Sequence, residues 1–196
     1  AASASYYSPN YAVDTLRPTL SISMSDQDIK VGDTSTVTFT FSEEPTGYFT
    51  ADVANGALSN FTVTADGGKK IYTATYTPTA DVEDTTNVIS VGTDWTDAAG
   101  NAASASYYSP NYAVDTRNPN LIVTSADTTS GLSGTSEAGA AISVTITDPS
   151  GVSRTLNATA DATNTGAWNI SSADILGSEV TSDDNGTYAF SVTASD

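Results

Sequence analysis

One stretch of fifteen residues occurs twice in this chain, letter for letter. AASASYYSPNYAVDT fills positions 1–15 and again positions 102–116, an offset of 101 residues. An identical repeat of that length does not arise by chance, so we expect the chain to come from a tandem array. A unit of about 100 residues can bury a core of its own, which excludes a solenoid of short repeats. The repeat therefore predicts two modules in 196 residues.

Apolar and polar residues alternate along most of the chain, and no segment keeps a helical period. The run 36–41, for example, places Val37, Phe39 and Phe41 on one face. Such alternation predicts half-buried antiparallel strands. In the first module we expect strands near 19–25, 34–42, 47–53, 59–65, 70–77, 87–93 and 101–113. About seven short strands per module predict an all-β fold of two tandem immunoglobulin-like antiparallel β-sandwich modules, joined end to end by a short linker.

The repeat defines the period of the array but leaves its phase open. In one phase, residues 1–14 are the last strand of a preceding repeat, and the modules span 15–115 and 116–196. The second module then lacks its own last strand. In the other phase the repeated segment is the first strand of each unit, which gives units at 1–101 and 102–196.

The chain is strongly acidic and lacks two of the most reactive side chains. Six basic residues against 23 acidic ones give a net charge of −17, and there is no cysteine or histidine. The charge disfavours binding to nucleic acid and to anionic membranes. Zinc, haem and thiol chemistry and histidine-based catalysis are excluded, and we expect no enzyme. No run approaches the about 18 apolar residues that span a bilayer.

Three acidic positions recur in the same order in both modules. The matched pairs are Asp14 and Asp115 in the linkers, Glu43 and Glu137 after the second strand, and Asp97 and Asp196 after the sixth. In an immunoglobulin-like sandwich these loops lie where the chain enters, so we expect the carboxylates to meet there, with Asp94 beside Asp97. Converging carboxylates repel one another unless a cation lies between them, and all-oxygen ligands favour calcium. The sequence therefore predicts calcium at both junctions, with Asn101 and backbone carbonyls as further ligands.

A second acidic group is expected at the opposite end of the first module. It comprises Asp26, Asp28, Asp33, Asp81, Glu83 and Asp84. Four of these, Asp26, Asp28, Asp81 and Asp84, are further metal candidates. The sequence leaves a second calcium site and a solvated acidic surface equally open.

Several motifs together resemble one family. They are Val31-Gly32-Asp33 ahead of the run 36–43, the stretch 96–101 (Thr-Asp-Ala-Ala-Gly-Asn), and the linker Val-Asp-Thr with proline four positions past its aspartate. This combination resembles the bacterial Ig-like repeats of giant surface adhesins, the Bap-like and RTX-type proteins exported by type I secretion. The resemblance implies a structural extender on the extracellular face of a bacterium, which supports cell adhesion and biofilm formation. It also implies calcium at the linkers and neighbouring repeats of the same polypeptide as partners.

Two other functions fit the sequence. The chain could be a carbohydrate-binding module that uses Trp95, Trp168 or the repeated tyrosines, which are Tyr6, Tyr7 and Tyr11 in the first copy and Tyr107, Tyr108 and Tyr112 in the second. Alternatively, it could form a surface filament by strand exchange, in which the N-terminal strand of one chain completes the sheet of a neighbouring chain.

Overall fold

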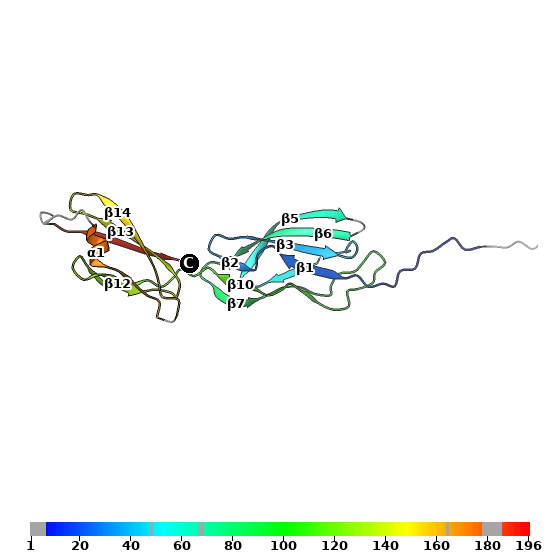
Figure 1. Cartoon of the computed structure of the whole chain (residues 1–196). Helices are drawn as coiled ribbons and strands as arrows, with labels where there is room; N and C mark the ends of the chain where they lie inside the picture. The colour runs from blue at the N-terminus through cyan, green and yellow to red at the C-terminus, as the bar shows by residue number, and fades with distance from the viewer. Residues whose placement is uncertain (1–6, 48, 67–68, 164, 178–185) are drawn as a thin grey trace, which may run out of the picture. The chain divides into compact units, whose positions relative to one another are not determined.

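The computed structural model describes residues 7–196, apart from positions 48, 67–68, 164 and 178–185. The described residues are mostly β-strands and turns, and the chain divides into two compact units, Ala1–Arg117 and Asn118–Asp196 (Figure 1). Each unit has its own cluster of buried apolar side chains. The predicted all-β class is confirmed.

The first unit is built from short strands, most of them where the alternation predicts them. Their bounds are β1 (Leu20–Met24), β2 (Asp28–Lys30), β3 (Ser35–Phe41), β4 (Ala51–Val53), β5 (Gly56–Asp66), β6 (Lys69–Pro78), β7 (Glu83–Asn87), β8 (Ile89–Val91), β9 (Tyr107–Tyr108) and β10 (Tyr112–Asp115). Strands β2 and β7 were not predicted. The second copy of the repeated segment contains β9 and β10.

These strands form the facing layers of an immunoglobulin-like sandwich. One sheet has the order β1-β3-β6-β5, and the others have the orders β4-β8-β9 and β2-β10-β7. Strand β10 pairs in parallel with β2 and antiparallel with β7. Strands β1 and β3 pair antiparallel from Leu20 opposite Phe41, so the chain enters at the end where β3 finishes.

Alternation along the strands accounts for the core of the first unit. Val37, Phe39 and Phe41 on β3 are fully buried, and they face Ile89 and Val91 from β8. Each buried side chain of this size stabilises the fold by about 1.5–3 kcal/mol relative to an exposed one.

The second unit is smaller and has two three-stranded sheets. Its elements are β11 (Ile122–Asp127), β12 (Gly131–Thr135), β13 (Ala141–Thr147), β14 (Ser153–Thr159), β15 (Ala167–Ile170), α1 (Ser172–Leu176) and β16 (Ala189–Ser195). The sheet orders are β11-β12-β15 and β14-β13-β16. The short helix α1 begins after Ser171, whose hydroxyl accepts a hydrogen bond from the backbone N–H of Asp174 at 3.1 Å, and it buries Ile175.

The two tryptophans do not supply the surface that a carbohydrate-binding module would need, whereas the repeated Tyr7, Tyr11 and Tyr108 are exposed and leave that alternative untested. Trp95 is 0% exposed and Trp168 is 3% exposed, so neither indole presents a face to a carbohydrate at the surface. Both are core residues because each lies on the inward side of its sandwich. Of the repeated tyrosines, Tyr112 is also fully buried, and Tyr6 lies outside the described residues.

Candidate metal centre

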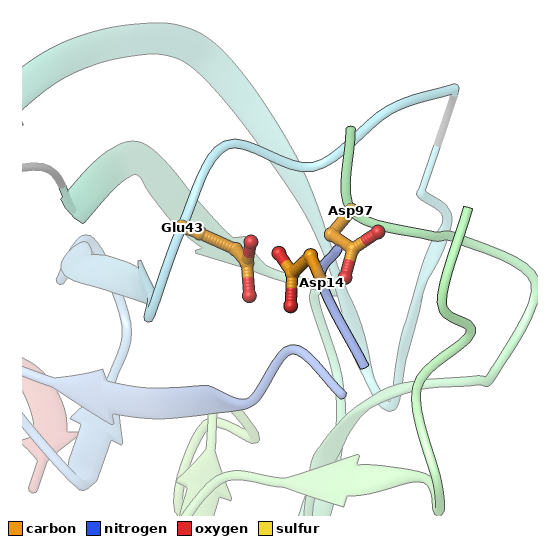
Figure 2. A group of neighbouring side chains, drawn as sticks. All are labelled: Asp14, Glu43 and Asp97. Atoms are coloured by element: carbon orange, nitrogen blue, oxygen red, sulfur yellow. The ribbon is translucent and has the colours of Figure 1, made fainter. Parts of the chain in front are cut away.

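Three carboxylates from three separate segments meet at the entry end of the first unit. Asp14 precedes β1, Glu43 follows β3 and Asp97 follows β8. One carboxylate oxygen from each lies within 4.8 Å of the others. Figure 2 shows the three carboxyl groups close together, with that of Asp14 between those of Glu43 and Asp97. The sequence-based expectation that these residues approach one another thus agrees with the geometry, while calcium binding there stays a prediction.

The pairing of β1 with β3 explains why Glu43 reaches Asp14. The backbone N–H of Thr19 donates to Ser42 Oγ at 2.9 Å, and the N–H of Ser42 donates to the Thr19 carbonyl at 2.9 Å. These bonds hold the entering chain against the end of β3. The residue after Ser42 therefore lies beside the segment that leads into β1.

Asp97 is held in a tight turn that Asn101 closes. The backbone N–H of Asn101 donates to Asp97 Oδ1 at 2.8 Å, and its Nδ2 donates to Asp97 Oδ2 at 2.8 Å. The turn passes through Gly100, whose φ of +91° suits glycine. Asn101 Nδ2 also donates to the Asp14 carbonyl at 3.1 Å. Asn101, which the sequence predicted as a ligand, thus uses its amide nitrogen to orient Asp97 and the entering chain.

The three carboxyl groups have unlike environments. Burial raises the pKa of Glu43 above its ordinary value, and the neighbouring carboxylates of Asp97 and Asp14 raise it further. Burial also acts to raise the pKa of Asp97, which is 1% exposed. The hydrogen bonds from Asn101, Ala99 and Gly100 outweigh that effect and hold the pKa of Asp97 below its ordinary value. The cluster therefore combines a firmly ionised carboxylate with one that is repelled by its neighbours.

The donor set fits a hard divalent cation. The cluster supplies only carboxylate oxygens, and calcium takes six to eight oxygen ligands from carboxylates, carbonyls and water. Transition metals that prefer nitrogen or sulfur find no such ligand in a chain without histidine or cysteine. Asp14 is exposed, which leaves the cluster open to solvent on the side of the entering chain. A bound ion would cancel the mutual repulsion of the three groups.

The electrostatics predict an unusual effect of replacing Glu43 with glutamine. In EDTA at neutral pH, Glu43→Gln is expected to raise the melting temperature of the first unit, because the folded state disfavours the ionised carboxylate. The gain should shrink as the pH falls through the raised pKa of Glu43, since the wild-type carboxyl is then neutral too. Differential scanning calorimetry over this pH range measures the effect.

Glu44 provides a matched control for this substitution. Glu44→Gln removes the same charge one residue away, but Glu44 pairs with Lys70 Nζ at 3.3 Å outside the cluster. It should not raise the melting temperature. Equal or lower stability of Glu43→Gln in EDTA would contradict the repulsion described here.

The other predicted metal positions at the junctions are placed differently. Asp94 lies outside the cluster, and its Oδ2 accepts a hydrogen bond from the Thr50 hydroxyl at 3.5 Å. Asp115 lies at the end of β10, where its Oδ1 accepts a bond from the backbone N–H of Arg117 at 3.3 Å. Glu137 and Asp196 belong to the second unit, so a site that joins them to Asp115 stays a prediction.

The acidic residues at the opposite end of the first unit are engaged in local bonds. Asp26 Oδ1 accepts from the backbone N–H of Asp28 at 3.0 Å. Asp84 accepts from the backbone and hydroxyl of Thr86 and from Asn55, and these bonds lower the pKa of its carboxyl. Within the described ranges, these acids form no group with the spacing of metal ligands.

Arg117 supplies a cation at this end, and the sequence analysis overlooked it. Arg117 Nη1 lies 2.9 Å from Glu83 Oε2, and its Nε lies 3.9 Å from Asp81 Oδ1. The sequence could have indicated this ion pairing, because Arg117 is one of only six basic residues and follows Asp115 by two positions. A guanidinium therefore compensates part of the charge for which the sequence proposed a second calcium ion.

The chain was compared with solved structures, with curated proteins and with models of protein families. Two solved structures resemble the chain at low identity. A tetra-tandem repeat from the extending region of a large adhesion protein shares 20% identity over 89% of this chain and 48% of that one, with a TM-score of 0.35. Tandem Ig repeats of Dlar share 13% identity over 92% of this chain and 94% of that one, with a TM-score of 0.31. This chain thus spans about half the length of the adhesion-protein structure.

No curated protein matches the chain. The described part of the chain holds no helix of the length and apolarity that a membrane span requires. The model of the bacterial Ig-like domain, by contrast, matches residues 14–114, which is just over half of the 196 residues. The match begins at Asp14 of the cluster and ends within β10, the last strand of the first unit. The chain therefore belongs to the bacterial Ig-like domain family.

Proposed function

We propose that this chain is a structural extender segment of a large bacterial surface adhesin, stiffened by calcium. The carrying observation is the cluster of Asp14, Glu43 and Asp97, which joins the segment entering the first unit to two loops of that unit. A cation held there would fix the direction in which the entering chain leaves the sandwich. Membership of the bacterial Ig-like family supports a structural, surface-exposed and non-enzymatic role.

The mechanism is mechanical. Without a cation, repulsion among the three carboxylates favours movement of Asp14, which is exposed and precedes β1 by a short segment. With a cation, Asp14 is tied to Glu43 and Asp97, so bending at the entry of the module is suppressed. By the same logic, Asp115, Glu137 and Asp196 would form an equivalent site at the next junction.

The calcium concentration would set the mechanical state. Extracellular calcium modules bind with Kd values of about 10⁻⁴–10⁻³ M. The array would therefore be rigid outside the cell and flexible at the low calcium concentration inside it, which suits export through a type I secretion channel. A rigid array holds an adhesive tip away from the cell surface and so supports adhesion and biofilm formation.

Calorimetry and small-angle X-ray scattering with calcium and with EDTA test this proposal. Calcium is expected to raise the melting temperature of the first unit and to narrow the distribution of maximum dimensions. Magnesium at the same concentration is the control, because its demand for near-ideal octahedral geometry suits a preformed three-carboxylate cluster less well. An unchanged melting temperature and scattering profile on adding calcium would overturn the proposal.

A further inference from the structure

An aromatic cavity opens in the first unit between β4 and β5, which are edge strands of two different sheets. Its volume is about 720 Å³. The lining residues carry no charge and are mostly apolar; they are Gly47, Phe49, Thr50, Ala51, Val53, Leu58, Phe61 and Tyr72. All of them belong to the first unit, and none belongs to the carboxylate cluster. The cavity is therefore a separate feature of the first sandwich.

Two of its walls are aromatic rings that the core holds in place. The rings of Phe49 and Tyr72 have centroids 5.3 Å apart and an angle of 75° between their planes. Phe41 packs against both from the core, with centroid distances of 4.9 Å to Phe49 and 5.6 Å to Tyr72. Phe49 and Tyr72 are only partly buried, so part of each ring remains at the surface of the cavity. The two walls are thus preformed.

A bulge in β5 brings a third ring to the cavity. Between Ser59 and Thr62 the register with β6 shifts, so that β5 holds one extra residue there. Asn60 lies within the bulge with a φ of +53°, a left-handed conformation that asparagine tolerates better than most residues. Phe61 follows it, lines the cavity and stays 56% exposed. Because bulges redirect side chains near functional sites, and Phe61 adds little to the core, its place suits a ligand.

The charge around the cavity is negative. The chain carries a net charge of −17. The hydroxyl of Thr50, in the lining, donates to Asp94 Oδ2 at 3.5 Å, which places a carboxylate beside the cavity. Lys70, two residues before Tyr72 on β6, pairs with Glu44 at 3.3 Å, so its charge is compensated. An anion would therefore be repelled from this site and a cation attracted to it.

We propose that this cavity binds a small organic cation with a quaternary ammonium group, of the kind that choline carries. The faces of aromatic rings are negative and attract a cation within about 6 Å of the ring centroid. A quaternary ammonium group is covered by methyl groups and donates no hydrogen bond, so it needs no polar ligand from the protein. Calcium, by contrast, requires oxygen ligands. The aromatic cavity and the carboxylate cluster therefore suit different cations.

Titration of the full chain with choline, followed by proton NMR, tests this proposal. EDTA is present so that the result does not depend on the calcium site, and the ionic strength is held constant. The N-methyl signal of choline should move upfield and saturate, because the ring currents of the aromatic walls shield bound methyl groups. A shift that stays linear in choline concentration would mean that there is no site.

A neutral analogue shows whether the positive charge is recognised. Dimethylbutanol has the shape of choline, with carbon in place of the nitrogen. It should bind at least about fivefold more weakly, since it lacks the attraction between cation and ring faces. Equal affinity would mean that the cavity accepts any apolar group of this size, which contradicts the proposal.

Phosphocholine distinguishes a free organic cation from a lipid headgroup. It carries the same quaternary ammonium group beside a phosphate, which the acidic chain should repel. Binding should therefore be weaker than that of choline. Equal or tighter binding of phosphocholine would refute the assignment to a free cation.

A matched set of substitutions locates the site. Phe61→Ala removes one wall, and Tyr108→Ala removes a ring outside the cavity that is 62% exposed. Both side chains are exposed, so both variants should fold like the wild-type chain. Phe61→Ala should weaken choline binding by at least about threefold, Phe61→Leu should do the same because it keeps apolar bulk without an aromatic face, and Tyr108→Ala should have no effect. Equal effects of Phe61→Ala and Tyr108→Ala, or wild-type affinity of Phe61→Leu, would overturn the proposal.

Discussion

Replacing Trp95 with alanine is expected to lower the free energy of unfolding of the first unit by about 3–5 kcal/mol. The indole is 0% exposed. Its ring meets Phe41 edge-on, with centroids 4.9 Å apart, and lies 6.3 Å from the ring of Tyr107. Its Nε1 donates to the Gly92 carbonyl at 3.0 Å, so truncation also removes the partner of a carbonyl group. A loss of this size is a large share of the about 5–15 kcal/mol that stabilises a typical domain.

Urea denaturation followed by far-UV circular dichroism measures the loss, since the substitution removes one of the two tryptophans and compromises fluorescence. Phe61→Ala is the matched control, because Phe61 is an aromatic residue of the same unit that is 56% exposed. It should change the free energy of unfolding by no more than about 0.5 kcal/mol. Wild-type stability of Trp95→Ala would mean that the indole is not part of the core.

The strands could be predicted wherever alternation continues over several residues. On β3 each inward residue from Ser35 to Phe41 is buried and the residues between are not, which is the pattern that the sequence displays. On β13 the same alternation buries Ile142, Val144 and Ile146. A period of two over seven residues identifies both the strand and its inward face, because one face must be covered by the opposite sheet.

Short elements stabilised by distant partners could not be predicted in this way. Strand β2 has three residues and one buried side chain, Ile29, and it exists because β10 pairs with it in parallel from 85 residues away along the chain. Helix α1 has five residues and too little length for a helical period. In both cases, tertiary packing rather than the local sequence selects the structure.

The cluster could be predicted in part, and the position of Asp94 outside it has a simple cause. Recurrence of acids in both modules identified Asp14, Glu43 and Asp97 as residues that meet. Asp94 was added because it is close in sequence. In the extended segment after β8, Trp95 and Asp97 are buried and Asp94 is exposed, since neighbouring side chains alternate between faces. Alternation alone would have separated Asp94 from Asp97.

Replacing Asp97 with asparagine is expected to abolish the response of the first unit to calcium. A ligand that binds only the folded state stabilises it by about 2.7 kcal/mol when its concentration is one hundred times its Kd. Asp97 is the most deeply buried of the three cluster carboxylates, and Asn101 holds both of its oxygens in place. The variant should therefore melt at the same temperature in calcium and in EDTA, whereas the wild-type chain should gain several degrees in calcium.

Asp94→Asn is the matched control, since it removes the same charge three residues away and outside the cluster. It should keep the calcium response in calorimetry and in titration of calcium into the protein. A calcium response of Asp97→Asn equal to that of Asp94→Asn would exclude the cluster as the calcium site.

The behaviour in EDTA distinguishes Asp97 from Glu43 even though both variants should lose calcium. The folded state lowers the pKa of Asp97, so its carboxylate stabilises the first unit above the ordinary pKa of about 3.9, and that contribution is lost as the pH falls through the lowered pKa. Asp97→Asn should therefore destabilise the first unit in EDTA at neutral pH, while Glu43→Gln stabilises it. The two substitutions should thus change stability in opposite directions without calcium, and both should remove the stabilisation by calcium. This combination is expected only if hydrogen bonds hold the carboxylate of Asp97 in place, while the carboxylate of Glu43 destabilises the fold and serves to bind the cation.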